Sequence, residues 1–314
     1  MGTNSQKSKI AYLIKKIFHS TIAKIIIGTV VLTIVYELPL GLLNDIFRAN
    51  QVIPIIRYTT IPIIIIFLIL VSYIALYRYY EKRKITELST HNIGKYLLFG
   101  LLLGLFLPSF SIFVAYLRDE YVVLSISNIT DVFLQDLTIS IAFGILTAIY
   151  EEVLCRGILF RLIEEKLGSY IALIISGVIF GFLHLMNDSN ALFAAVAISI
   201  MSISITAAYM YTRNLWSPIA IHFAWNFTQG DIFGTPVSGE PASTLIMISQ
   251  LEGSKWFTGG EWGIEATIQT VVFGLIAGIL LLVLCHKKGQ IIHRNTSKIE
   301  NNEDDKQETE NAST

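Results

Sequence analysis

Three short groups of polar and ionisable side chains lie inside strongly apolar stretches of this 314-residue chain. They read Glu151-Glu152-x-x-x-Arg156, Phe180-x-x-x-His184 and His222-x-x-x-Asn226. Of the six histidines in the sequence, His184 and His222 are the two inside apolar segments. A charge in a bilayer core costs about 2.5–3.5 kcal/mol on insertion scales, so a charge that persists there indicates function. These three groups are therefore the candidate site residues.

Helical spacing predicts how these side chains face one another. Residues four apart share a helix face, so Glu152 and Arg156 are expected to form an ion pair. Glu151 is rotated by about 100° from Glu152 and has no such partner, so it can face elsewhere. Asn226 follows His222 by the same spacing and should point into the same space. Phe180, one turn before His184, is expected to wall the site or hold the histidine ring.

An unpaired carboxylate, two imidazoles and a carboxamide suit the hydrolysis of a peptide bond. Burial raises the pKa of a carboxyl group toward neutrality, which favours Glu151 as the general base that activates water. The histidines can orient that water or protonate the leaving amine, and Asn226 can donate to the oxyanion. The same Glu151, His184 and His222 also fit a zinc site with one open position for water. The residues do not choose between these two chemistries.

The composition requires that these groups be positioned by membrane helices. Hydrophobic residues make up 53% of the chain and charged residues 15%, against about 25% charged in soluble proteins. The mean hydropathy is +0.61. A net charge of −1 gives no basic field for nucleic acid, and two cysteines cannot form a disulfide framework.

The apolar residues form eight segments, most of them close to the 20 residues that cross a bilayer. Approximate bounds are 21–43, 59–77, 96–117, 136–160, 169–186, 191–211, 215–227 and 263–285. Uninterrupted apolar runs favour helices over a membrane barrel. We therefore expect an all-α polytopic membrane bundle with about eight transmembrane helices.

The flanking charges predict the orientation. One alternate set of flanks is rich in basic residues and contains Lys15, Lys16, Arg78, Lys82, Arg83, Lys84, Arg161, Lys166, Arg213, Lys287 and Lys288. The opposite set contains Arg48, Arg57, Arg118 and Lys255. Both termini are thus predicted to be cytosolic. Residues 1–130 form a predicted N-terminal membrane region, 131–286 a five-span core, and 287–314 a disordered acidic tail.

The order and spacing of the three motifs resemble the CAAX-protease and bacteriocin-processing family (CPBP, also called Abi) of intramembrane proteases. The resemblance covers roughly residues 136–285 and includes a Gly-rich turn at 259–263. It implies that Glu151 activates water, that Arg156 holds Glu152, and that His184, His222 and Asn226 complete the site. Eukaryotic relatives cleave the last three residues from prenylated proteins, and many bacterial members act in bacteriocin maturation or self-immunity. The Ile-, Lys- and Asn-rich composition favours a bacterial cell membrane.

The leading hypothesis is an intramembrane endopeptidase that hydrolyses a membrane-associated or lipidated peptide or protein. Membrane lipids are its expected surroundings, with zinc as a cofactor only if the metal mechanism applies. Two alternatives are a non-catalytic bacteriocin self-immunity or scaffold protein and a proton-coupled transporter. Lys24 and Glu37 are predicted to lie at the membrane interfaces, and Cys155 is predicted to be a small buried hydrophobe rather than a nucleophile.

Overall fold

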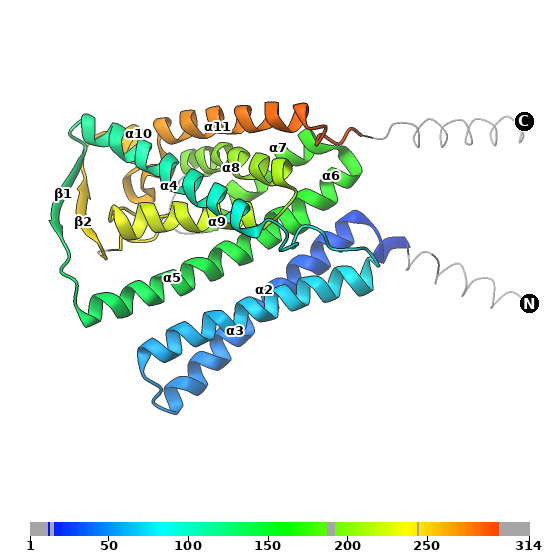
Figure 1. Cartoon of the computed structure of the whole chain (residues 1–314), viewed down its shortest axis with the longest axis horizontal. Helices are drawn as coiled ribbons and strands as arrows, with labels where there is room; N and C mark the ends of the chain where they lie inside the picture. The colour runs from blue at the N-terminus through cyan, green and yellow to red at the C-terminus, as the bar shows by residue number, and fades with distance from the viewer. Residues whose placement is uncertain (1–11, 13–15, 187–191, 244, 295–314) are drawn as a thin grey trace, which may run out of the picture.

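The computed structural model describes residue 12 and residues 16–186, 192–243 and 245–294. It is a bundle of helices with one small sheet (Figure 1). The helices are α2 (Thr21–Ala49), α3 (Pro54–Ala75), α4 (Ile93–Leu117), α5 (Asp131–Glu152), α6 (Arg161–Leu167), α7 (Ser169–Leu183), α8 (Leu192–Thr212), α9 (Trp216–Asn226), α10 (Lys255–Thr258) and α11 (Ile268–Lys287). The strands are β1 (Tyr121–Ile126) and β2 (Met247–Leu251).

Six helices of the described residues are long and apolar enough to cross a membrane. They are Thr21–Ala49, Pro54–Tyr80, Ile93–Leu117, Asp131–Leu167, Leu192–Thr212 and Ile268–Lys287. The all-α polytopic bundle predicted from the sequence is therefore confirmed. The two remaining predicted spans form shorter helices: α7 has 15 residues and α9 has 11. Because α9 is buried almost throughout by protein, it does not need the length that lipid exposure demands.

The outer face of α2 carries a row of apolar side chains at helical spacing. Each is roughly half exposed or more, and the row contains Ile22, Ile26, Val30, Ile34, Leu38, Leu42 and Ile46. An apolar stripe of this length is not stable in water. Together with the six long helices, it identifies an integral, multi-pass membrane protein.

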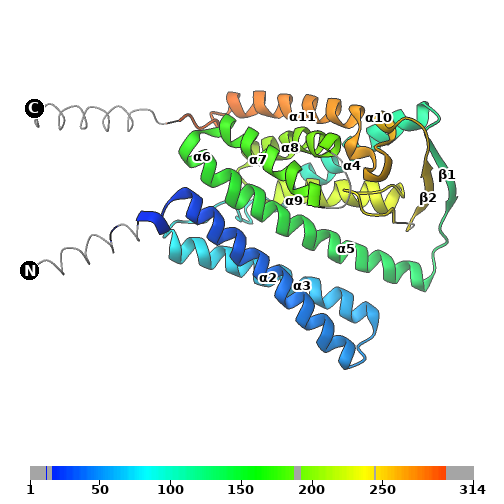
Figure 2. The ribbon, with the colours of Figure 1, turned by 180° about the vertical axis from the view of Figure 1, so that it is seen from behind.

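The helices are arranged in two groups that meet at α5. Helices α2 and α3 run side by side as a hairpin, as Figures 1 and 2 both show. Helix α3 packs against α5, and α2 packs against the segment that follows α5. On the other side of α5, α9 packs on α4, while α8 packs on both α7 and α11. Buried side chains of α3, including Ile65, Ile69 and Tyr73, share one core with Leu146 and Ile149 of α5. Helix α5 is thus held from both sides, and it ends at the first motif.

Two glycines allow the motif-bearing helices to approach their neighbours closely. A Cβ atom on Gly104 of α4 would lie 2.3 Å from the Ile221 carbonyl oxygen and 2.8 Å from the Ala224 Cβ of α9. A Cβ atom on Gly181 of α7 would lie 2.2 Å from the Ala195 carbonyl oxygen of α8. Small residues at such crossings are typical of membrane helix packing. The two contacts fix the helices that carry His222 and His184.

The small sheet pairs β1 with β2 in antiparallel fashion, with Tyr121 opposite Leu251 and Ile126 opposite Met247. The register shifts between Val123 and Ser125. The sequence analysis did not predict either strand. The sheet ties the segment after α4 to the long connection between α9 and α11.

The last long helix begins later than its apolar segment suggests. The prediction placed its start at Gly263, but α11 begins at Ile268. The residues before α11 cannot continue a helix, because their φ values are positive, at 58° to 74°, for Gly259, Gly260 and Gly263. Thr267 then caps α11, because its side-chain oxygen accepts a hydrogen bond from the Thr270 backbone N–H.

One end of the bundle carries a cluster of ion pairs. Glu81 forms ion pairs with Lys24 (3.3 Å), Arg83 (3.3 Å) and Arg161 (3.2 Å). Arg213 pairs with the Glu164 carboxylate at 2.5 Å. Lys24, predicted at a membrane interface, therefore has a carboxylate partner at this end. Arg83, Arg161 and Arg213 belong to the basic-rich set of flanks defined in the sequence analysis.

The predicted acidic tail begins within the described part of the chain. Helix α11 ends at Lys287, and the Ser169 N–H then donates to the Ile292 carbonyl at 2.8 Å. The Ile292 N–H donates in turn to the Ser169 hydroxyl at 2.8 Å. Residues 295–314 of the predicted tail lie outside the described residues.

Candidate active site

A buried carboxylate joins two of the three motifs. Glu152 Oε1 accepts a hydrogen bond from Arg156 Nη1 at 2.8 Å, and His222 Nδ1 lies 2.8 Å from the same oxygen. The Glu152 side chain is fully buried and Arg156 is 1% exposed. The ion pair expected from the four-residue spacing therefore forms, and it extends to a histidine on another helix. Charge-assisted contacts of this kind are strong inside a protein.

Arg156 extends the contact network to α8 and α7. Its Nε donates to Thr206 Oγ1 at 3.2 Å and its Nη2 to the Ser202 carbonyl at 3.3 Å. The guanidinium carbon lies 4.8 Å from the centre of the Phe180 ring. A buried guanidinium needs such partners, because an unpaired charge there is costly. The arginine thus holds α5, α8 and α7 around one point.

The contact with Glu152 determines which nitrogen of His222 is available. A carboxylate paired with arginine accepts hydrogen bonds, so the His222 Nδ1 carries the proton that is donated to it. The other ring nitrogen, Nε2, lies 3.8 Å from Glu151 Oε2. This distance is beyond a direct hydrogen bond. Glu151 is 27% exposed, unlike its buried neighbour.

Phe180 and His184, the second motif, lie beside the residues of the first and third motifs. His184 Nδ1 lies 2.8 Å from the Phe180 carbonyl oxygen, which can only accept, so this nitrogen is the donor. The Phe180 ring meets the His184 ring edge-on at 4.8 Å and the His222 ring at 6.3 Å. The phenylalanine thus walls the site and holds the histidine ring, the two possibilities that the sequence analysis raised.

Helices α5 and α9, which carry the first and third motifs, each continue at the carboxyl-terminal end into a π-helical segment. One spans Val153–Phe160, directly after Glu152, and the other spans Phe227–Ile232, directly after Asn226. Segments of this kind are rare and occur frequently at functional sites. In the first, the Gly157 carbonyl accepts from Tyr73 Oη at 3.0 Å and from Arg161 Nε at 2.9 Å. Side chains thus satisfy a backbone oxygen inside the widened turn.

A cavity of about 520 Å³ is lined in part by the Glu151 side chain. It is lined by Thr29, Thr33, Glu37, Tyr150, Glu151, Leu154, Cys155, Phe180, Leu183 and His184. Glu37 therefore lies on the cavity beside Glu151, although the sequence placed it at the outer interface. Cys155 is 3% exposed and packs in an apolar cluster with Phe180 and Trp262, as expected of a buried hydrophobe.

A second, much smaller space lies on the other side of His184. Its volume of about 10 Å³ corresponds to at most about one water molecule. Its polar lining residues are His184, His222, Asn226, Ser238 and Glu265. The structure therefore brings His222 and Asn226 to one space, as their spacing predicted. Phe180 and His184 line both this space and the larger cavity.

The sequence analysis missed Glu265, which lies in a short 3-10 turn before α11. Its side chain is buried, at 2% exposure. The signal that could have found it is a carboxylate inside the segment 263–285, which was predicted to span the membrane. Burial raises the pKa of the Glu265 carboxyl above its ordinary value, and the nearby His184 and His222 oppose this rise.

The zinc hypothesis requires three ligands that converge on one point. Within the described residues, no group of three or more His, Cys, Asp or Glu side chains is arranged to hold a metal ion. Glu152 and the Phe180 carbonyl hold the Nδ1 atoms of His222 and His184, as is usual for metal-binding histidines, so the two Nε2 atoms are available, and what the described residues lack is the convergence of three ligands. The predicted set Glu151, His184 and His222 does not fit a zinc ion in this arrangement, so no reaction step is derived through one.

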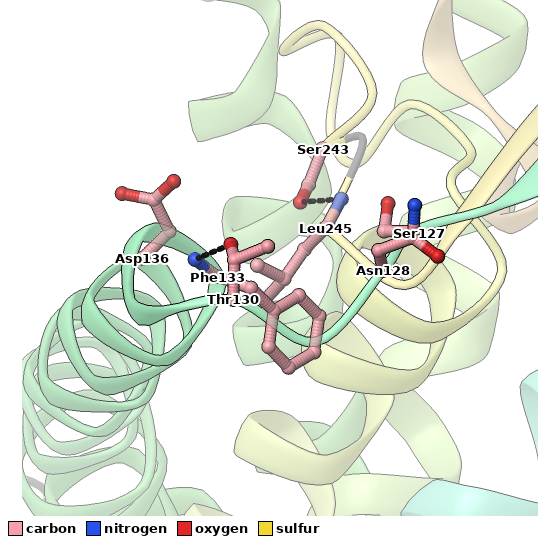
Figure 3. Close-up of a pocket in the computed structure, with 7 residues that line it drawn as sticks. All are labelled: Ser127, Asn128, Thr130, Phe133, Asp136, Ser243 and Leu245. Atoms are coloured by element: carbon pink, nitrogen blue, oxygen red, sulfur yellow. Dashed lines mark hydrogen bonds between the residues drawn. The ribbon is translucent and has the colours of Figure 1, made fainter.

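Another cavity, of about 380 Å³, opens at the start of α5. Figure 3 shows its lining residues, with Thr130 capping the Phe133 N–H and the Asp136 carboxylate directed away from the others. Asp136 precedes Glu151 by 15 residues on one helix, which is about 22 Å at 1.5 Å per residue. This cavity contains none of the motif residues and is not part of the candidate site.

Residues 133–228, about a third of the chain, match the family model described as Rce1-like, type II CAAX prenyl endopeptidase. The matched segment contains all three motifs, from Glu151 to Asn226. No curated protein and no solved structure matches the chain in the corresponding comparisons. The matched segment and the six long apolar helices support a membrane-embedded endopeptidase of the CAAX type. Residues 133–228 are therefore similar to the CAAX-type endopeptidases that the three motifs also resemble.

Proposed function

We propose that this chain is an intramembrane endopeptidase in which Glu151 activates the water that attacks the peptide bond. The observation that supports this assignment is the difference between two adjacent glutamates. Glu152 is buried and paired with Arg156 and His222, whereas Glu151 is partly exposed on the 520 Å³ cavity. A general base must reach both water and substrate, and Glu151 meets that requirement.

In the proposed reaction, a water molecule between Glu151 and His222 Nε2 is the nucleophile. The Glu151 carboxylate accepts a proton as the water oxygen bonds to the carbonyl carbon. The fixed orientation of His222 follows from its hydrogen bond to Glu152, since Nδ1 is held and Nε2 lies 3.8 Å from Glu151 Oε2. Arg156 donates a hydrogen bond to Glu152 and so holds in place the side chain that orients the histidine.

The oxyanion and the leaving amine are assigned to the remaining motif residues. Asn226, at the end of α9, is proposed to donate to the oxyanion, a role that contributes about 3–4 kcal/mol in other hydrolases. His184 is proposed to donate a proton to the leaving nitrogen through Nε2, because its Nδ1 is held by the Phe180 carbonyl. The peptide C–N bond then breaks, giving a carboxylic acid and an amine.

The substrate is proposed to be a membrane-associated or lipidated peptide or protein. An apolar cavity wall with few charges, formed by Leu154, Phe180 and Leu183, suits an unfolded segment that arrives from the lipid phase. The charged end of the bundle is proposed to face the cytosol, which places both termini there. Membrane lipids surround the exposed apolar face of α2.

The direct test is cleavage of a quenched membrane-peptide library by purified protein in detergent. Glu151→Gln keeps the size of the side chain but removes the base, so cleavage should fall by at least about 100-fold. Glu252→Gln, at an exposed position after β2, is the matched control and should cleave like the wild type. Equal cleavage by wild type and Glu151→Gln would remove Glu151 from the reaction.

A further inference from the structure

A cavity of about 550 Å³ lies at the end of the bundle that carries the ion pairs. The last turns of the candidate membrane span Pro54–Tyr80 and the segment after it form this cavity. Its described lining residues are Ile74, Arg78, Arg83, Lys84, Ile85, Leu88 and Ser89. Three of these are basic and none is acidic, and none belongs to the three motifs. The cavity is therefore a positively charged space separate from the candidate active site.

Two of the three basic side chains on this cavity can bind an anion. The Arg83 guanidinium is already held by carboxylates, since it lies 3.3 Å from Glu81 Oε2 and donates to Glu87 Oε2 at 3.1 Å. Arg78 and Lys84 are exposed and, within the described part of the chain, have no ion-pair partner. Arginine and lysine are the side chains that bind phosphate groups in proteins. The cavity thus offers two cations to one phosphate.

An apolar row on α3 leads to the same cavity. Ile63, Phe67, Val71 and Ile74 follow one another at intervals of three or four residues, and each is at least 40% exposed. Ile74 ends the row and lines the cavity, and Arg78 follows it by four residues. From Ile63 to Ile74 the helix rises about 17 Å at 1.5 Å per residue. One leaflet of a bilayer has a hydrocarbon thickness of about 15 Å, so the row is as long as one acyl chain.

We propose that the cavity and the apolar row of α3 together bind an anionic phospholipid. The phosphate lies against Arg78 and Lys84, and one acyl chain lies along the row that ends at Ile74. The cavity lies at the end of a membrane span, which is the level of lipid headgroups, and basic pockets at this level bind anionic headgroups in other membrane proteins. Binding of this kind goes beyond the proposed protease function and does not depend on it.

The apolar part of the wall favours a phospholipid over a free phosphate ion. Ile74, Ile85 and Leu88 give no favourable contact to inorganic phosphate, whereas the glycerol backbone and the first methylene groups of a lipid bury them. A free ion would interact only with two exposed cations, whose charges the solvent screens. A lipid gains the ionic contacts and the apolar burial together.

The first test is lipid binding to the purified full-length protein, measured by native mass spectrometry in an uncharged detergent. The probes are dioctanoyl phosphatidylglycerol, dioctanoyl phosphatidylcholine and inorganic phosphate. The wild type should bind the phosphatidylglycerol with a Kd at least about tenfold lower than that of either other probe. Equal binding of the phosphatidylcholine would show lipid contact without headgroup recognition and would overturn the proposal. Equal binding of inorganic phosphate would also overturn it, because the site would then recognise an ion alone.

The variant for this test combines Arg78→Gln with Lys84→Gln. It should raise the Kd for the phosphatidylglycerol at least about tenfold, and its Tm without lipid should match the wild type, since neither side chain holds an ion pair. The matched control combines Lys82→Gln with Lys287→Gln. It removes two charges from exposed positions in the basic-rich set of flanks, outside the cavity, and should bind like the wild type. An equal loss of binding in the control would indicate general attraction to a positive surface and overturn the site.

The second test uses the wild type and therefore does not depend on how a variant folds. A phosphatidylglycerol that carries a photoreactive diazirine on its acyl chain is cross-linked to the protein, and the labelled peptides are identified. The label should lie within residues 63–89, and an excess of unmodified phosphatidylglycerol, but not of phosphatidylcholine, should remove it. A label outside this segment would overturn the proposal. Glu151→Gln should be labelled like the wild type, so a failure of the proposed protease function and a failure of the lipid site are distinguishable.

Discussion

His222 Nδ1 lies 2.8 Å from Glu152 Oε1, and this contact joins α9 to α5 inside the bundle. The same oxygen accepts from Arg156, whose other nitrogens reach Thr206 and the Ser202 carbonyl on α8. One carboxylate oxygen therefore connects three helices. We therefore expect substitutions of Glu152 and of its neighbour Glu151 to affect stability and cleavage differently.

Replacing Glu152 by Gln should destabilise the protein. Arg156 would remain buried without its counter-ion, which costs about 3–5 kcal/mol in comparable cases. Thermal unfolding in detergent should show a clearly lower Tm, together with loss of cleavage. Glu151→Gln serves as the comparison, because Glu151 has no arginine partner within the described structure and should lose cleavage at an unchanged Tm. A wild-type Tm for Glu152→Gln would show that the ion pair does not hold the fold.

A methyl group at Gly104 should disturb the site from a distance. In Gly104→Ala the new Cβ would lie 2.3 Å from the Ile221 carbonyl, so α9 must move and take His222 with it. Overpacking of this kind typically costs about 1–3 kcal/mol. We expect a lower Tm and a lower kcat. Gly94→Ala, on the same helix but with no atom within 4 Å of its Cβ, is the control and should match the wild type.

Chelators should leave the activity unchanged. The described residues contain no set of three ligands for a metal, and the proposed chemistry uses Glu151 as the base. Cleavage by the wild type should therefore be equal with and without a strong zinc chelator after prolonged dialysis. Loss of cleavage that added zinc restores would instead support the metal mechanism and require the site to rearrange.

Glu87, which pairs with Arg83 at the end of the bundle that carries the ion pairs, should make part of the protein's stability depend on pH. Burial alone would raise the pKa of Glu87, but hydrogen bonds from Arg83 and Tyr73 outweigh this effect and hold its pKa below the ordinary value. A lowered folded-state pKa stabilises the protein above the unfolded value of about 4.3. That stabilisation is lost as the pH falls further, through the folded value.

This expectation can be measured from Tm values in detergent between pH 7 and pH 3.5. The wild type should lose stability on acidification, whereas Glu87→Gln should start lower at pH 7 and lose less below pH 4.3. Glu252→Gln is the exposed control and should follow the wild-type curve. If Glu87→Gln and the wild type differ by a constant amount at every pH, the titration of Glu87 does not contribute.

The sequence predicted those parts of the site that depend on helical spacing alone. The Glu152–Arg156 pair and the common space of His222 and Asn226 are contacts within one helix, so a fixed rise and rotation are enough to foresee them. The contact between Glu152 and His222 spans 70 residues. It depends on the packing of α9 against α5 and α4, which no local pattern encodes.

Other differences have local causes that a hydropathy pattern does not resolve. The π-helical segments after Glu152 and Asn226 are invisible in an apolar run, and the strands β1 and β2 are too short to give a periodic signal. Glu37 and Glu265 sit near the ends of predicted spans, where an ionisable residue is usually explained by access to water. Their position on the cavities follows only from tertiary structure.

The hydrogen bond from Tyr73 to the Gly157 carbonyl has a consequence for any attempt to isolate a minimal protease. Tyr73 lies on α3, before the family segment 133–228, and it anchors the widened turn that carries Arg156. Residues that surround or support the site therefore lie on both sides of that segment: Tyr73 lies before it in the sequence and Glu265 lies after it. A fragment cut at the family boundaries would carry every motif residue and still lack the framework that aligns them.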